Sequence, residues 1–499
     1  MKLSLLSVNI AANYLGVVIT TLLSFLVVPF YLKWLGHDAY GLVGIAAMIQ
    51  GWVMLLNSGL APVAGRKAAE AYSGKGNWQE AVKFFRTIDW LIFILAMVVV
   101  ICIFFSRDWL AINWISESQL PPHDVATSLV LLVAMTLLRL MTSVSRGVIA
   151  NIEMQVWLNY NLILFSLLRF AMSLPIVYWT KNIEYLFIWW LLVSAFEYLS
   201  IQIKISMSLP VKAAFWVFDL LQLKENGRNA AMLAVTSCVW VVVTNLDKLL
   251  LSGYLSLSEF GLFSLAILLA GGIVTLSQPI CQAFQPKLTR AYALGGKEAV
   301  GDSLMLCTRL VAILIYPIGS VIFCMPEMVL YAWTGDVSIA VDAASILQGY
   351  TIGNTFLAAS GLLYMVQVAL NDVRWHFRGN IIFAIILIPS LLLIVKNYGA
   401  EGASWLWAVY NLVLFVIWNS FLLKKLLHIK PMRWVVVEAL LPLCLALCSS
   451  ALLAGLVALA DFSRMQVFIW LAFCGVSVSA LVVIWTSFLQ RSIVFLTRH

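Results

Sequence analysis

The stretch "TIDWLIFILAMVVVICIFF" at residues 87–105 decides the fold class of this chain. It is almost wholly apolar, and a helix needs about 20 such residues to cross the hydrocarbon core of a bilayer. Runs of this kind recur along all 499 residues, of which 63% are hydrophobic and 11% charged. Soluble domains are about 25% charged. The composition therefore excludes a cytosolic enzyme, a secreted domain and a disordered chain, and it predicts an all-α polytopic membrane protein.

Apolar runs of about 20 residues predict fourteen transmembrane spans. The runs are nearly continuous, which excludes a β-barrel, because barrel strands alternate apolar and polar residues. The gaps between runs are too short for a soluble domain of about 50 residues, so the helices and their connections must carry the function. The predicted spans are 8–31, 40–64, 87–105, 126–149, 156–179, 184–205, 230–252, 259–285, 306–328, 341–368, 377–397, 402–423, 435–459 and 466–488.

The basic residues fall mainly in the gaps between these runs. The formal net charge is +8, but this distribution is typical of a membrane protein, so we expect no nucleic-acid partner. With a cytoplasmic N-terminus, about 23 of the 31 basic residues lie on the cytoplasmic side, which predicts that both termini are cytoplasmic. The eight cysteines lie in apolar runs without a CxxC pair. We therefore predict no disulfide framework, metal site or cofactor.

Two segments of the chain align at an offset of 220 residues. "WLGHDAYGLVGIA", beginning at residue 34, matches "YLSLSEFGLFSLA", beginning at residue 254, and the match places Gly41 opposite Gly261. Six spans separate the copies, so both begin on the same side of the membrane, which predicts a parallel repeat. The predicted domains are an N-terminal lobe of spans 1–6 at 1–210, a C-terminal lobe of spans 7–12 at 211–430, and spans 13–14 with a cytoplasmic tail at 431–499.

Both copies of this repeat carry a family resemblance. "YLKWLGHDAYGLVGIAAMIQGWVMLLNSGLAPVAGRKAAEAY" at 31–72 and "TNLDKLLLSGYLSLSEFGLFSLA" at 244–266 resemble the polysaccharide-transporter branch of the MOP flippase superfamily. This branch includes the Wzx-type O-antigen flippases and is related to the lipid II flippase and to MATE exporters. The resemblance covers roughly residues 8–425.

The resemblance implies a function, a location and partners. Such proteins move undecaprenyl-diphosphate-linked oligosaccharides across the bacterial inner (cytoplasmic) membrane by alternating access. The implied partners are the lipid-linked oligosaccharide, membrane lipids, H⁺ or Na⁺ as a coupling ion, and other membrane proteins of polysaccharide assembly.

Arginines lie within two neighbouring predicted spans, with Arg139 and Arg146 in span 4 and Arg169 in span 5. A charge at mid-membrane costs about 2.5–3.5 kcal/mol on insertion scales, so each needs a reason. In "LVAMTLLRLMTSVSRGVIAN" at 132–151, Arg139 and Arg146 share one helix face, and Arg169 occupies the next span. Guanidinium groups match phosphate oxygens and stay charged, so we interpret Arg139, Arg169 and Arg146 as a diphosphate-binding set. The alternative for Arg146 is a side chain that extends to the cytoplasmic surface.

Three further charged residues in the spans have two interpretations each. Glu197 lies in the sixth span, where it either pairs with Arg169 to hold the lobe together or takes part in ion coupling. Asp247 and Lys248 are adjacent in the seventh span and point to different helix faces. They either form a local structural pair, or Asp247 takes up a proton or cation that drives transport.

Polar side chains also recur at helical spacing in two other spans. In span 8 the stripe comprises Gln278, Gln282 and Gln285, and in span 1 it comprises Asn13, Thr20 and Ser24. Amides and hydroxyls at this spacing either line a cavity that accepts sugar hydroxyls or make interhelical hydrogen bonds worth about 0.6 kcal/mol each. We favour the cavity.

These observations together predict a lipid-linked oligosaccharide flippase rather than an enzyme. The first alternative is an ion-coupled multidrug exporter of the MATE type, which the basic interior of spans 4 and 5 disfavours because drug cations prefer acidic surroundings. The second is a membrane glycosyltransferase or polymerase, which commonly needs acidic motifs on a substantial outer loop that this chain lacks. The third alternative is a non-transporting scaffold protein of an envelope assembly complex.

Overall fold

The computed structural model describes the backbone of residues 5–115, 118–211, 238–457 and 462–496, and the side chains within these ranges except at 5–11, 54–62 and 489–496. By its internal contacts, the chain divides into two compact units, Met1–Gly261 and Leu262–His499. The predicted boundary at 210–211 adjoins residues 212–237, which lie outside the described residues together with the start of predicted span 7 at residue 230. The three-part division into lobes stays a prediction.

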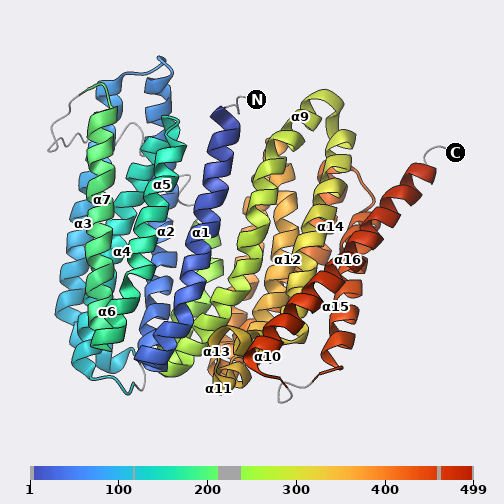
Figure 1. Ribbon diagram of the computed structural model, residues 1–499. Coiled ribbons are helices and arrows are strands. Elements are labelled where there is room, and N and C mark those ends of the chain that lie inside the picture. The colour runs from blue at the N-terminus through green and yellow to red at the C-terminus, as the bar shows by residue number, and fades with distance from the viewer. Residues whose placement is uncertain (1–4, 116–117, 212–237, 458–461, 497–499) are drawn as a thin grey trace. The chain divides into compact units, whose positions relative to one another are not determined.

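The first unit is a bundle of long helices (Figure 1). Its central helix is α4, which packs against α2, α3 and α7, while α1 packs on α5. Apolar residues of α2, α3, α4 and α7 form one buried core, with Ile88, Val144 and Ile201 fully enclosed. The helices are α1 (Leu5–Leu35), α2 (His37–Tyr72), α3 (Trp78–Asn113), α4 (Pro122–Asn151), α5 (Gln155–Ser166), η1 (Leu167–Ala171), α6 (Ser173–Thr180), α7 (Ile183–Ser208) and a helix over 238–254.

Local signals in the sequence set several of these helix starts. Asn77 precedes α3 and its side chain accepts a hydrogen bond from the backbone of Gln79, and Asn182 caps α7 in the same way. Pro122 opens α4, where its missing N–H leaves no hydrogen bond unmade. The caps place the long apolar segments so that each begins close to a polar turn.

The second unit begins within α9 (Leu257–Cys324), which turns over at Gly296, where φ is +65°. A similar break at Gly399, with φ +54°, divides α13 (Arg374–Val413). Glycine suits both positions because other residues rarely adopt such a φ. The remaining elements are α10 (Pro326–Thr334), α11 (Val337–Asp342), α12 (Ala344–Ala369), η2 (Leu414–Trp418), α14 (Asn419–Leu422), η3 (Leu423–Leu427), η4 (Arg433–Leu440), α15 (Leu441–Ala454) and α16 (Arg464–Leu496).

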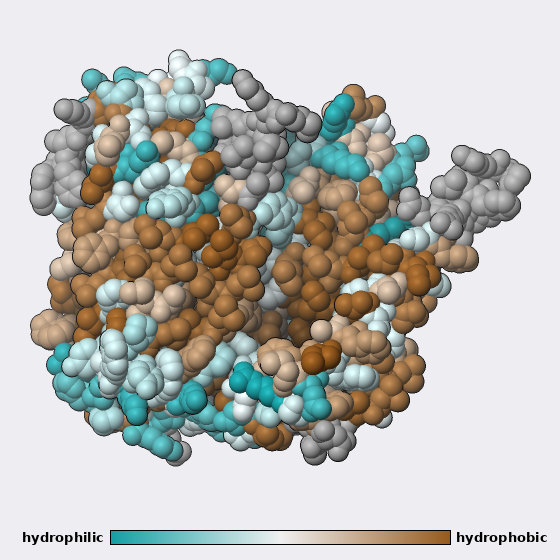
Figure 2. Space-filling model, in the orientation of Figure 1, coloured by the Kyte–Doolittle hydropathy of each residue, from teal (hydrophilic) through white to brown (hydrophobic). Residues whose placement is uncertain are grey.

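The predicted all-α membrane architecture is confirmed. Ten helical segments among the described residues are long and apolar enough to span a bilayer, and two of them, of 68 and 54 residues, contain the glycine breaks. The described helices are compatible with the fourteen predicted spans. On the face that Figure 2 shows, each unit carries a hydrophobic band with hydrophilic residues at both ends, as a bilayer requires.

A buried ion pair joins the C-terminal segment to α9. Arg309 of α9 donates from Nε and Nη2 to the two carboxylate oxygens of Glu438 in η4, each at 2.7 Å. Beside it, the Trp434 indole donates to the Thr308 hydroxyl at 2.8 Å. Glu438 is completely buried, so this pair holds predicted span 13 firmly within the second unit.

We expect Glu438→Ala to lower the stability of the protein by about 3–5 kcal/mol, because it leaves the Arg309 guanidinium without its partner in an apolar interior. The double variant Arg309→Met/Glu438→Leu removes both charges and should recover most of that loss. Thermal unfolding of the purified variants at a fixed heating rate measures both effects. A single variant as stable as the wild type would contradict the assignment.

Two glycines that the sequence repeat aligns approach each other in the first unit. A Cβ added to Gly261 would lie 3.1 Å from the Gly41 nitrogen, and one added to Gly41 would lie 2.1 Å from the Leu257 carbonyl oxygen. Both obstacles are backbone atoms, which cannot move aside as a flexible side chain can. The start of α2 and the start of α9 therefore cross at a distance that only glycine permits.

Gly41→Val should accordingly destabilise the protein by about 1–3 kcal/mol through overpacking. The matched control is Gly271→Val, since a Cβ at Gly271 would meet no atom within 4 Å. Unfolding temperatures measured side by side test the difference, and equal losses in the two variants would count against a close crossing at Gly41.

Candidate functional site

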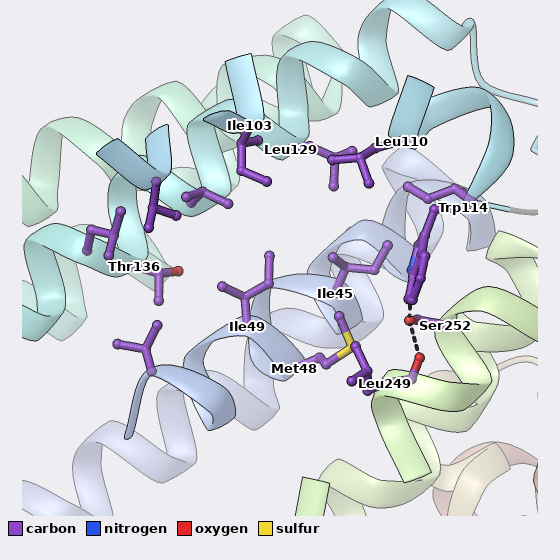
Figure 3. A pocket seen from close by; sticks show the side chains of 15 residues that line it. Ile45, Met48, Ile49, Ile103, Leu110, Trp114, Leu129, Thr136, Leu249 and Ser252 are labelled. Atoms are coloured by element: carbon purple, nitrogen blue, oxygen red, sulfur yellow. Dashed lines mark hydrogen bonds between the residues drawn. The ribbon is translucent and has the colours of Figure 1, made fainter. Parts of the chain in front are cut away.

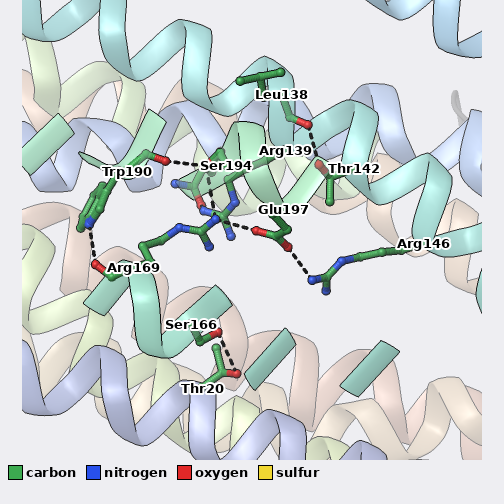
Figure 4. Close-up of polar contacts among 11 residues, drawn as sticks. Thr20, Leu138, Arg139, Thr142, Arg146, Ser166, Arg169, Trp190, Ser194 and Glu197 are labelled. Carbon is green, nitrogen blue, oxygen red and sulfur yellow. Dashed lines mark hydrogen bonds and ion pairs between the residues drawn. The ribbon is translucent and has the colours of Figure 1, made fainter. Parts of the chain in front are cut away.

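A polar pocket of about 310 Å³ lies inside the first unit (Figure 4). Residues of α1, α4, α5, η1 and α7 surround it, and it contains all three arginines of the predicted diphosphate set. The lining residues are Thr20, Thr21, Ser24, Arg139, Thr142, Ser143, Arg146, Leu162, Ser166, Arg169, Phe170 and Glu197. Hydroxyl and guanidinium groups from four helical elements and one carboxylate from α7 thus converge on one cavity.

Arg169 is placed by a local change in helix geometry. It lies in the π-helical turn η1 between α5 and α6, a distortion that is frequent at functional sites. Pro175 follows shortly, and its missing N–H leaves the carbonyl of Ala171 without the usual helical donor. The Trp190 indole of α7 donates to the Arg169 carbonyl at 3.0 Å. The turn and this hydrogen bond hold Arg169, which is 6% exposed, against α7.

Glu197 connects two of the arginines. Its Oε2 accepts from Arg169 Nη2 at 2.7 Å, and its Oε1 accepts from Arg146 Nη2 at 2.5 Å. Ser194, one turn earlier on α7, accepts from Arg169 at 3.2 Å. Figure 4 shows Glu197 between the two guanidinium groups. One carboxylate therefore serves two cations.

Arg139 differs from its neighbours in having no carboxylate partner. Its Nη1 donates to the side-chain oxygen of Gln50 in α2 at 2.5 Å, and within the described part of the chain no Asp or Glu lies within 4.0 Å of it. Three arginines and one glutamate line the pocket, so their formal charges sum to +2. An excess of this kind in an apolar bundle favours an anionic ligand.

The structure thus places the predicted residues of spans 4 to 6 together. The sequence left the Arg169–Glu197 ion pair as one of two interpretations. The structure contains this pair, and both of its residues also line the pocket. Arg146 turns to Glu197 instead of extending to the surface. The roles of these residues in binding stay predictions.

The predicted polar stripe of span 1 is divided. Thr20 and Ser24 line the pocket, and the Thr20 hydroxyl lies 3.2 Å from that of Ser166. Asn13 is exposed outside the pocket and accepts a hydrogen bond from Asn159. Two of the three residues therefore meet the arginines, and the third ties α1 to α5.

The glutamine stripe and the charged pair of span 7 lie elsewhere. In α9, Gln278 and Gln282 are exposed and Gln285 is half-buried, all in the second unit. Lys248 donates to the Thr244 carbonyl at 2.7 Å and to the Asn245 side chain at 3.1 Å, while Asp247 is buried on the same helix. None of these residues lines the arginine pocket, and their predicted roles in cavity lining and ion coupling stay untested.

A second buried polar network adjoins the pocket, and the sequence did not reveal it. Arg86 of α3 donates to Gln202 of α7 at 2.7 Å, and Gln202 donates to Asp89 at 2.8 Å and to Ser145 at 3.1 Å. Tyr198 also donates to Asp89, at 3.0 Å. The sequence analysis also did not predict the contact of Gln50 with Arg139. The only signal for this network in the sequence was the opposite charge of Arg86 and Asp89, which are three positions apart. Such pairs are common on exposed helices.

A separate cavity of about 350 Å³ in the first unit is apolar (Figure 3). Side chains of α2, α3, α4 and the helix over 238–254 surround it, among them Ile49, Ile103 and Leu249. The polar groups at its edge hydrogen-bond to other groups of the protein. The Trp114 indole donates to the Ser252 hydroxyl at 3.2 Å, and Ser252 donates to the Leu249 carbonyl at 2.8 Å. Such a cavity offers an anion no donor.

Possible metal ligands in the described residues occur away from the pocket. His123, Asp124 and Glu184 bring three ligand atoms within 4.8 Å of one another at exposed or half-buried positions. Acidic groups at a surface do not by themselves define a metal site.

Comparisons with known proteins place the chain in a family. Residues 6–291, more than half of the chain, match the model of the family described as polysaccharide biosynthesis protein. The chain belongs to this family. No curated protein sequence matches it.

Solved structures share the fold at low sequence identity. A structure titled lipid II flippase MurJ in an inward closed conformation is 14% identical, with a TM-score of 0.70 over 98% of this chain and 99% of that one. A structure of the MATE multidrug transporter DinF-BH is 16% identical, with a TM-score of 0.63 over 85% and 97%. An inward-facing MATE family transporter is 15% identical, with a TM-score of 0.64 over 82% and 95%. These likenesses establish the fold alone.

Water and anions should reach the pocket. In a background with the eight natural cysteines replaced, we expect Ser143→Cys to react with thiosulfonate reagents, and the anionic reagent to react faster than the cationic one because of the arginines. Ser128→Cys, on the same helix but fully buried, is the control and should stay unmodified. Faster reaction with the cationic reagent would refute the electrostatic description.

Proposed function

We propose that this protein is a flippase that moves an undecaprenyl-diphosphate-linked oligosaccharide, such as an O-antigen or a similar surface-polysaccharide repeat unit, from the cytoplasmic to the outer leaflet. The arginine pocket is the diphosphate site. One observation carries the proposal: three arginines share a pocket with a single carboxylate. The family match and the shared fold support a transporter of lipid-linked saccharides.

The chemistry of the pocket suits a diphosphate. A diphosphate with a lipid at one end and a sugar at the other is negatively charged on both phosphates. The guanidinium groups of Arg139, Arg146 and Arg169 offer planar sets of donors whose geometry matches phosphate oxygens. The hydroxyls of Thr20, Ser143 and Ser166 add neutral donors to the same cavity.

The size of the pocket limits what it holds. Ligand cavities are about 300–1,000 Å³, so 310 Å³ is enough for a small polar group and not for an oligosaccharide with its lipid. In the proposed cycle the isoprenoid tail stays in the bilayer while the diphosphate occupies the pocket. Alternating access of the lobes at 1–210 and 211–430 then exposes the head group to the other side, with spans 13–14 attached to the second.

The surroundings of the protein follow from the same proposal. The excess of basic residues in alternate gaps supports cytoplasmic termini in the bacterial inner membrane. Asp247, Lys248 and Glu197 are the proposed groups for H⁺ or Na⁺ coupling, and other polysaccharide-assembly membrane proteins are proposed partners. A ligand stabilises only the states it contacts best, so an ion gradient would reset the cycle.

Reconstitution in liposomes tests the proposal. We expect Arg139→Ala to slow the flipping of a labelled prenyl-diphosphate-linked oligosaccharide by about tenfold or more, since hydrogen bonds to charged groups contribute about 1.5–3 kcal/mol. Arg139→Lys should retain part of the activity. Arg66→Ala is the control, because Arg66 is exposed and pairs only loosely with Glu70 at 3.4 Å.

Three results would contradict the proposal. Transport by Arg139→Ala at the wild-type rate would remove the diphosphate site. Efflux of a cationic dye without movement of the lipid-linked saccharide would favour the multidrug exporter, and sugar transfer by the purified protein would favour an enzyme.

A further inference from the structure

Glu197 is the one carboxylate among the lining residues of the pocket, and it lies between two of the three arginines. Its two oxygens each accept from a different arginine, Arg169 at 2.7 Å and Arg146 at 2.5 Å. A carboxylate and a phosphate present the same kind of acceptor to a guanidinium group. Figure 4 shows the Glu197 carboxylate between these two arginines.

We propose that Glu197 is an internal counter-anion, which holds Arg146 and Arg169 while the site is empty and releases them to the diphosphate when it binds. The inference rests on the proposed function and adds a residue that sets the affinity of the site. Three unpaired guanidinium groups in an apolar bundle would repel one another and lose hydration. One carboxylate offsets part of this cost without neutralising the pocket.

The arginines retain unused donors that point to a ligand. The Nε atoms of Arg146 and Arg169 are buried and have no hydrogen-bond partner, although a buried polar atom normally has one. Arg169 as a whole is 6% exposed. Glu197 accepts one hydrogen bond from an Nη2 of each arginine, and this arrangement leaves both Nε atoms without an acceptor. A diphosphate carries more oxygens and can satisfy these atoms.

A second deeply buried glutamate among the described residues also has an arginine partner, and it shows the geometry of a purely structural pair. In the second unit, Glu438 receives both Nε and Nη2 of Arg309 in a fork geometry, and its side chain is fully enclosed. Glu197 is instead split between two cations, one of which, Arg146, has 24% of its side chain exposed at a cavity. In the Arg309–Glu438 pair, two donors of the guanidinium group meet the two carboxylate oxygens. Around Glu197 there is a cavity, and two arginine Nε atoms have no acceptor, so a ligand could replace the carboxylate.

The test compares affinities for inorganic pyrophosphate and for farnesyl diphosphate by calorimetry with purified protein. We expect Glu197→Gln to bind farnesyl diphosphate about tenfold more tightly than the wild type, because the competing charge is gone. Loss of a merely structural contact would weaken binding, so the sign of the change is informative. Glu438→Gln is the matched control, with lower stability expected and unchanged affinity.

A second variant covers the case in which Glu197→Gln does not fold. Glu197→Asp keeps the negative charge, but its shorter side chain reaches only one of the two arginines, so it should also bind the diphosphate more tightly, by a smaller factor. Thermal unfolding with and without pyrophosphate gives an independent reading. The ligand should raise the unfolding temperature more in either Glu197 variant than in the wild type.

The outcomes separate this inference from the proposed function. If the wild type binds farnesyl diphosphate and the Glu197 variants bind it equally or more weakly, the counter-anion role is refuted and the diphosphate site stands. If neither the wild type nor the variants bind either probe, both proposals fall. Tighter binding in Glu438→Gln would also refute the inference, because the effect would not be specific to the pocket.

Discussion

The arrangement of the first unit depends on the high free energy of a guanidinium group in an apolar bundle. Arg139, Arg146 and Arg169 can lie there only because polar partners reach them from other helices. Gln50 comes from α2, and Glu197 and Ser194 come from α7. These contacts require the helices to pack at the depth and rotation at which donor and acceptor meet. The same contacts leave the pocket positively charged, so the groups that stabilise the bundle also define what it can bind.

The two buried arginine–glutamate arrangements show that hydrogen-bond geometry, more than burial, distinguishes a structural ion pair from a binding site. The Arg309–Glu438 fork uses matching atoms on both sides and joins η4 to α9. In the pocket, one carboxylate accepts from the Nη2 atoms of two arginines, and the buried Nε atoms of both arginines remain without acceptors. Because an unsatisfied buried donor costs free energy that a ligand can recover, the incomplete arrangement is the one suited to reversible binding.

The sequence predicts the helices well because apolar length is a property of each segment alone. It also predicts that Arg139 and Arg146 share a face, since seven residues make two turns of one helix. Contacts between helices are harder to predict, because the spacing of residues within one helix does not give its depth or rotation relative to another. For this reason the sequence left the Arg169–Glu197 pair as one of two interpretations, and the contact of Gln50 with Arg139 was missed. The π-helical turn at Leu167–Ala171 adds a further reason. It shifts the helical phase, so that Ser166 faces Thr20 and the pocket while Ser173 is buried against Tyr31.

Fold likeness alone does not choose among the functions of the proteins that share this fold. Structures titled as a lipid II flippase and as multidrug transporters match the chain at 14–16% identity and similar TM-scores, and one fold can host unrelated ligands. The choice depends on the local chemistry of the site. A pocket with a formal charge of +2 from three arginines and one glutamate repels a drug cation, because repulsion between like charges is strong where water is scarce. The sign of that charge therefore favours an anionic head group over a cationic drug, independently of any resemblance between the backbones.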